Sequence, residues 1–259
     1  MPRIRWRRLA FFLVVLVTLG LAGLFAGMVV LMNVQPGFMG MAHFTELHHR
    51  IHDLTFASLN ATATVGMLAQ LRRPVRNIAG QLMALIPFGA LLLAVALTNT
   101  SVLSPPWLLV GAAAVLATML HPVGDPLRSF SAARLDRPML ALVGVAAVPL
   151  LAFAWTNIAL QRAGPSDHAF LGPYGYLAAL SFSVIGVGIL SSLRPDGWRL
   201  TGWVAAGLPA ALGVASLVYP DVDSSLTPPW AIAAIAWAVV FLARVEIGRG
   251  REAAAASSA

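Results

Sequence analysis

Long apolar stretches alternate with short polar segments along the whole chain, and this pattern predicts membrane-spanning helices. A helix needs about 20 apolar residues to cross the hydrocarbon core of a bilayer. Eight stretches approach or exceed that length, at roughly residues 9–32, 54–71, 78–98, 106–121, 138–160, 174–193, 200–219 and 230–244. The fourth and eighth stretches are short, so seven spans with one re-entrant segment form the alternative topology.

Three sequence landmarks occur twice, about 122 residues apart. The pairs are LAQLR at 68–72 and LSSLR at 190–194, Ile86-Pro87 and Leu208-Pro209, and LSPPW at 103–107 and LTPPW at 226–230. This repeat predicts an all-α integral membrane protein of about eight transmembrane helices, arranged as two tandem four-helix modules. Because four spans is an even number, both modules face the same way, and a parallel pseudo-twofold axis would relate them.

The repeat also predicts the domain organisation. A first transmembrane module covers residues 1–122 and carries an external histidine-rich amphipathic helix at about 41–53. A cytoplasmic linker covers 123–137, and the second transmembrane module covers 138–246. We expect the remaining residues, 247–259, to form a disordered cytoplasmic tail, because they are mostly small and polar.

The distribution of charge indicates how the chain is oriented in the membrane. The chain is 59 % hydrophobic and only 10 % charged, and its 17 basic residues are all arginine. With the N-terminus inside, only Arg50 and Arg162 lie outside, which is the positive-inside bias. We therefore expect a multi-pass plasma-membrane protein with both termini in the cytoplasm. The net charge of +7 reports this orientation and attraction to anionic lipid, and it does not predict a nucleic-acid partner.

Several functional classes lose support from what the sequence lacks. There is no cysteine, which excludes disulfides and thiolate metal sites. No predicted span carries a charge near its middle, where ion-coupled transporters usually place ionisable groups. No phosphate-binding glycine loop or nucleophile elbow occurs. We assign no catalytic residue. Arginine without lysine, together with abundant alanine, favours a prokaryotic origin.

One cluster of residues could carry chemistry, and it lies just before the second predicted span. On a helix, His48, His52, His49 and Asp53 fall at about 0°, 40°, 100° and 140° around the axis. Phe44, Leu47, Ile51 and Leu54 gather on the other side. Arg50, at about 200°, points away from the histidine face. The segment is therefore predicted to be an amphipathic helix with one histidine-rich face.

This face predicts a site for a transition metal or haem. His48 and His52 are one helical turn apart, as are His49 and Asp53, so each pair can reach one cation. Imidazole and carboxylate ligands suit zinc, copper, nickel or iron. We predict metal ligation by His48, His49, His52 and Asp53, completed by His168 from the second repeat. Haem would use His48, His52 and His168 as candidate axial ligands. Such a site would serve electron transfer or sensing.

Two other interpretations stay open at this point. The histidines could form a solvated, pH-sensitive surface, since a helix on a membrane surface needs a polar face. The protein would then be a non-enzymatic transporter or scaffold that holds a small apolar molecule or lipid in the groove between the two modules. Polar residues of the second and fifth spans would line that groove: Asn60, Thr62, Thr64, Thr156 and Asn157. Alternatively, the chain is one subunit of a homo-oligomer or larger membrane complex.

Overall fold

The computed structural model describes residues 2–34, 49–99, 105–129, 134–164, 172–222 and 224–257. Within these ranges the chain forms eight α-helices and no strand. The helices are α1 (Pro2–Val34), α2 (Arg50–Arg72), α3 (Ile78–Thr98), α4 (Pro105–Met119), α5 (Arg137–Ala163), α6 (Pro173–Ser192), α7 (Trp198–Val218) and α8 (Pro228–Ser257). Short 3-10 turns, η4 (Pro74–Arg76) and η5 (Pro126–Ser129), lie between α2 and α3 and between α4 and α5.

The eight apolar stretches correspond one to one to these helices, which confirms the all-α prediction. Six helices are long and apolar enough to cross a membrane: α1, α3, α5, α6, α7 and α8. The helix α4 has only 15 residues. The helix α2 is long enough but less apolar, since Asn60, Thr62, Thr64 and Gln70 interrupt it. The helix α8 continues to Ser257, so residues 247–257 are helical where we expected a disordered tail.

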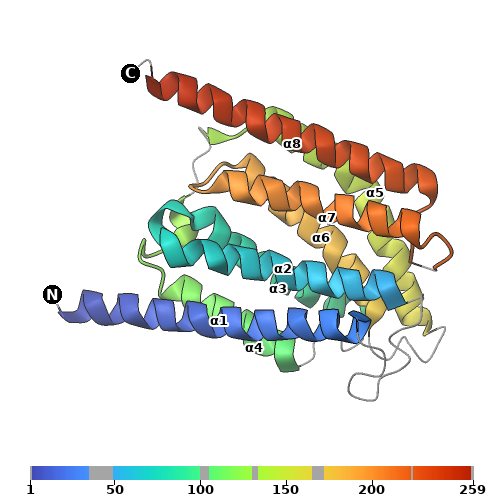
Figure 1. The fold of residues 1–259 in the computed structure, drawn as a ribbon, viewed down its shortest axis with the longest axis horizontal. Helices are drawn as coiled ribbons and strands as arrows, with labels where there is room; N and C mark the ends of the chain where they lie inside the picture. Colours follow the sequence, from blue (N-terminus) through green and yellow to red (C-terminus); the bar gives the residue numbers. More distant parts are fainter. Residues whose placement is uncertain are drawn as a thin grey trace.

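The helices are arranged around two central ones, α3 and α6. These two spans are the most buried of the six, and they pack directly against each other. Figure 1 shows α1 and α4 on one side of this centre and α8 on the other, while α5 runs diagonally across the bundle. A side chain at Gly186 of α6 would press against Ile86 of α3. This glycine therefore permits the close approach of helices that membrane interfaces favour.

The arginine-bearing ends of the helices meet at one end of the bundle. Arg7, at the start of α1, donates to the carbonyl of Met119 at the end of α4, at 3.0 Å. The amide of Ala79 in α3 donates to the carbonyl of Asp196 before α7, at 2.9 Å. At the opposite end, Arg162 of α5 donates to the carbonyl of Leu97 in α3. In Figure 1, both chain ends lie at the same end of the bundle.

A buried carboxylate ties three helices together at the arginine-rich end. Asp136 caps α5 by accepting from the amide of Met139, at 3.0 Å. Its other oxygen accepts from Arg244 of α8 at 2.7 Å and lies 3.5 Å from Arg194, just after α6. The Asp136 side chain is 1 % exposed. Its charge is thus balanced by two guanidinium groups instead of by water.

Replacing this carboxylate should destabilise the protein strongly. Asp136→Ala leaves Arg194 and Arg244 without their counter-charge, and breaking a buried ion pair from one side costs about 3–5 kcal/mol. We expect a clearly lower thermal unfolding midpoint in detergent, followed by tryptophan fluorescence.

The matched control is Asp196→Ala, which removes a carboxylate paired with Arg134 at 2.8 Å on the exposed surface. An exposed pair contributes about 0–1 kcal/mol, so this variant should unfold close to wild type. Equal thermal unfolding midpoints for Asp136→Ala and Asp196→Ala would show that the Asp136 carboxylate does not stabilise the packing of α5, α6 and α8.

Candidate functional site

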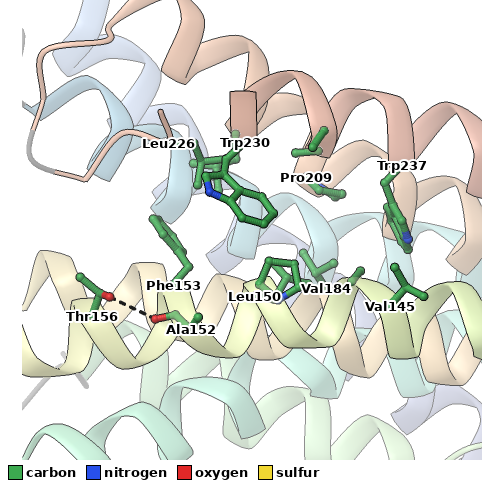
Figure 2. Close-up of a pocket in the computed structure, with 15 residues that line it drawn as sticks. Val145, Leu150, Ala152, Phe153, Thr156, Val184, Pro209, Leu226, Trp230 and Trp237 are labelled. Atoms are coloured by element: carbon green, nitrogen blue, oxygen red, sulfur yellow. Dashed lines mark hydrogen bonds between the residues drawn. The ribbon is translucent and has the colours of Figure 1, made fainter. Parts of the chain in front are cut away.

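A groove of about 400 Å³ lies between α5 and α8. Its floor is formed by Val184 of α6 with Pro209 and Leu212 of α7. Figure 2 shows Val145, Leu150, Phe153 and Thr156 along one wall and Trp230 and Trp237 along the other. Leu226, in the loop before α8, lies at the same end of the groove as Trp230. This volume lies within the range that binding sites for small molecules occupy.

The groove exists because α5 and α8 are joined at one end only. At the arginine-rich end, the indole N–H of Trp237 donates to the carbonyl of Leu142 at 2.9 Å, beyond which Arg244 binds Asp136. Toward the other end, α8 presents the small side chains of Ala233 and Ala234 to the groove, followed by Trp230. By contrast, α1 and α4 pack together through a shared cluster that includes Phe11, Val15, Ala114 and Ala117.

Two rigid elements shape the walls of the groove. Pro149 lies inside α5 and Pro209 inside α7, and both rings line the groove. A proline within a helix removes one backbone hydrogen bond and bends the helix. On the α8 side, the ring of Trp237 is held by its bond to Leu142 and by stacking on Phe241, with ring centroids 4.8 Å apart.

The lining of the groove is apolar, and it faces outward from the bundle. Among the described residues that line it, none is acidic, basic or histidine. The Thr156 hydroxyl, on its edge, donates to the carbonyl of Ala152 at 3.1 Å, as Figure 2 shows. Val145 is 68 % exposed and Trp230 is 56 % exposed although both line the groove. The site is therefore suited to hold an apolar molecule that enters from the side, and it lacks groups for acid–base chemistry.

The predicted metal site falls partly within the described residues. His48 and His168 lie outside them. His49 is buried and precedes α2 with helical backbone angles, φ −80° and ψ −19°. His52 and Asp53 lie in the first turn of α2, so this part of the histidine segment extends the second span instead of forming a separate helix. Among the described residues, no three His, Cys, Asp or Glu side chains gather to hold a metal ion.

The His52 side chain connects α2 to two other parts of the bundle. Its Nε2 lies 2.8 Å from the hydroxyl oxygen of Ser224, between α7 and α8. Its ring meets Tyr174 of α6 edge-on, with centroids 5.4 Å apart. Nearby, Phe56 contacts both Trp107 of α4 and Tyr176 of α6. His52 therefore contributes to packing at the end of the bundle opposite the arginines.

The polar residues that we expected to line a groove between the modules form hydrogen bonds within their own helices. Each bonds a carbonyl one turn earlier in its own helix: Asn60 to Phe56, Thr62 to Ser58, Thr64 to Asn60, Thr156 to Ala152 and Asn157 to Phe153. Asn60 and Asn157 are also fully buried. A groove between the two halves of the chain stays a prediction, and the groove found among the described residues lies between α5 and α8.

A second buried histidine lies at the arginine-rich end, just beyond α4. His121 is completely buried, and the amide of Val123 donates to its Nδ1 at 3.3 Å. Its Nε2 lies 3.3 Å from the Gln70 side-chain oxygen, and its ring meets Phe11 edge-on. Since Nδ1 accepts a hydrogen bond, the ring is neutral. Burial lowers the pKa of His121 from 6.5 to about 4, against the opposing effect of a hydrogen bond with the Pro74 backbone.

Sequence reasoning missed the groove, although two signals for it were present. Pro149 lies in the middle of an apolar span, where a proline marks a bend. Trp230 and Trp237 are seven residues apart and so lie on one face of α8. Neither signal indicates that α5 and α8 diverge, because that depends on contacts between helices far apart in sequence.

Comparison with known proteins adds no relative: no family model, curated protein or solved structure matches this chain. The fold alone therefore defines the class, an all-helical protein with several long apolar helices of membrane-spanning type.

The buried His121 should make the protein less stable in mild acid. Because the folded pKa lies below the unfolded value, the unfolded chain takes up a proton first as the pH falls from 6.5 toward 4. The stability supplied by neutral His121 is thus present above pH 6.5 and lost toward pH 4. As the pH is lowered from 6.5 to 4, we expect the unfolding midpoint of wild type to fall more than that of His121→Asn. A difference that does not change with pH would contradict the neutral, buried imidazole.

Proposed function

We propose that this protein is a non-enzymatic membrane protein that binds a lipid-like apolar molecule in the groove between α5 and α8. The observation that carries this proposal is the groove itself: it is apolar, free of ionisable side chains and open at its side. The exposed residues beside it, such as Val148 and Trp155 of α5 and Val239 of α8, are of the kind that face lipid. An apolar molecule could thus reach the groove directly from the bilayer.

Shape, and not hydrophobicity, would drive binding in this environment. Lipid tails are as apolar as the groove, so transfer from lipid into the groove gains little from the hydrophobic effect. A chain lying between α5 and α8 would contact protein on three sides, and many small dispersion contacts add up. The small side chains of Ala233 and Ala234 in α8 leave space for the bound molecule, while Trp230 and Trp237 supply broad flat surfaces. The groove is therefore expected to select molecules by fit.

The orientation and role of the protein follow from the same features. We place the arginine-rich end in the cytoplasm of a plasma-membrane protein, with both termini on that side, because basic residues concentrate on the cytoplasmic side of membranes. Two tandem modules, as the repeat predicts, would then present one groove, in the second module. Without ionisable groups in the groove, the protein would act as a carrier or scaffold, alone or within an oligomer.

A terminally brominated hexadecane tests this proposal, because bromine quenches indole fluorescence on contact and two indoles line the groove. Wild-type protein in detergent should show saturable quenching. Ala233→Leu fills the groove, and since overfilling a packed site costs about 1–3 kcal/mol, affinity should fall by about tenfold. The control Ala236→Leu adds the same side chain to an exposed position of α8 outside the groove and should bind like wild type. Quenching that does not saturate, or that is equal in both variants, would contradict the proposal.

A second proposal, the metal or haem site, is favoured by one observation. The backbone is helical from His49 into α2, so His49 and Asp53 lie one turn apart, as the ligand pattern requires. His48 and His168, which lie outside the described residues, would supply the remaining ligands. A bound redox metal there would support electron transfer or sensing.

Elemental analysis and a visible absorption spectrum test this second proposal. Wild-type protein should carry a stoichiometric metal or a haem absorption band, and a variant with His48, His49 and His52 all replaced by alanine should lose it. A colourless wild-type protein without metal would show that these histidines serve packing.

A further inference from the structure

One carbonyl of α5 beside the groove lacks the intrahelical donor that a regular helix would supply. In α5, Pro149 lies four positions after Val145, and both residues line the groove. The carbonyl of Val145 would normally accept from the amide of residue 149, one turn later. Proline has no N–H, so this bond is missing. Because the carbonyl lies between two residues that face the groove, it lies on the groove side of the helix.

The surroundings make this carbonyl a strong acceptor. Val145 is eight residues from Arg137 at the start of α5, which places it about 12 Å along the helix from the arginine-rich end. Water does not reach hydrocarbon at such depth, and an unsatisfied backbone group there is unfavourable. The nearby indole N–H of Trp237 does not supply the bond, because it donates to the carbonyl of Leu142. Ordinary acyl chains carry no donor.

We infer that the groove prefers a long apolar molecule that carries a hydroxyl group, such as a long-chain alcohol, whose O–H donates to the Val145 carbonyl. This inference rests on the proposed function and specifies the ligand class of the same site. The apolar body would lie along α5 toward Phe153 and Trp230. The hydroxyl would lie at the deep end near Trp237, and the low dielectric there strengthens the bond.

The test compares two brominated probes, ω-bromohexadecanol and its methyl ether. In the ether a methyl group replaces the hydroxyl hydrogen, so it cannot donate a hydrogen bond. Both are titrated against wild-type protein in the same detergent, and quenching of tryptophan is measured. One hydrogen bond in a buried site corresponds to a preference of about five- to tenfold for the alcohol. Equal affinities of wild type for alcohol and ether would overturn the inference while leaving the proposed function intact. If neither probe binds, both fail.

Two proline variants locate the acceptor. Pro149→Ala restores an N–H to the Val145 carbonyl, so the preference for the alcohol should disappear while ether binding persists. Pro209→Ala is the matched control, because it also removes a proline ring from the groove. The carbonyl that Pro209 frees is that of Ala205, which is fully buried and does not line the groove. Pro209→Ala should therefore keep the preference. Loss of the preference in both variants, or in neither, would overturn the assignment to Val145.

Discussion

The buried carboxylate of Asp136 holds α5, α6 and α8 together at the arginine-rich end. The shape of this side of the bundle depends on how far along α5 and α8 such contacts extend. Two guanidinium groups and the amide of Met139 surround it, so its charge is compensated within the protein. One further contact, between Trp237 and Leu142, extends the tie along α8. Beyond that contact nothing of comparable strength draws α5 and α8 together, and the groove begins there.

Backbone hydrogen bonding determines which polar groups the helices leave unpaired. Within hydrocarbon, helices persist because they satisfy their own amides and carbonyls. The Thr hydroxyls and the Nδ2 groups of Asn60 and Asn157 inside α2 and α5 donate to carbonyls of their own helices, while the buried Oδ1 atoms of these two Asn residues have no hydrogen-bond partner in the described part of the chain. Pro149, which lines the groove, removes one backbone donor from α5, and the inferred preference for a hydroxyl group rests on this missing donor.

The sequence predicted the helices well and the site poorly, for physical reasons that particular residues show. Helix starts follow from local signals, such as Asp136 before α5 and the Pro-Pro pairs that open α4 and α8. Most predicted ends lie within a few residues of the observed ones, but α1 begins earlier, at Pro2, and α8 ends later, at Ser257. The prediction of a metal or haem site at His49 and His52 also came from a local signal, the spacing of histidines along one helix face. What they do in the fold depends on distant partners, as the contact of His52 with Ser224, 172 residues away, illustrates. The segment 247–259 was expected to be disordered from its composition, yet Glu252 and the run Ala253–Ala256 also favour helix, and α8 continues to Ser257.

The central claim is that α5 and α8 enclose a groove that an apolar molecule occupies in the membrane. A crystal structure of the wild-type protein grown from a lipidic phase tests it most directly, because the lipid is present during crystallisation. The account predicts elongated density between α5 and α8, bounded by Trp230 and Trp237, with one end near the Val145 carbonyl. A structure in which α5 and α8 close against each other along their length, as α1 and α4 do, would contradict it.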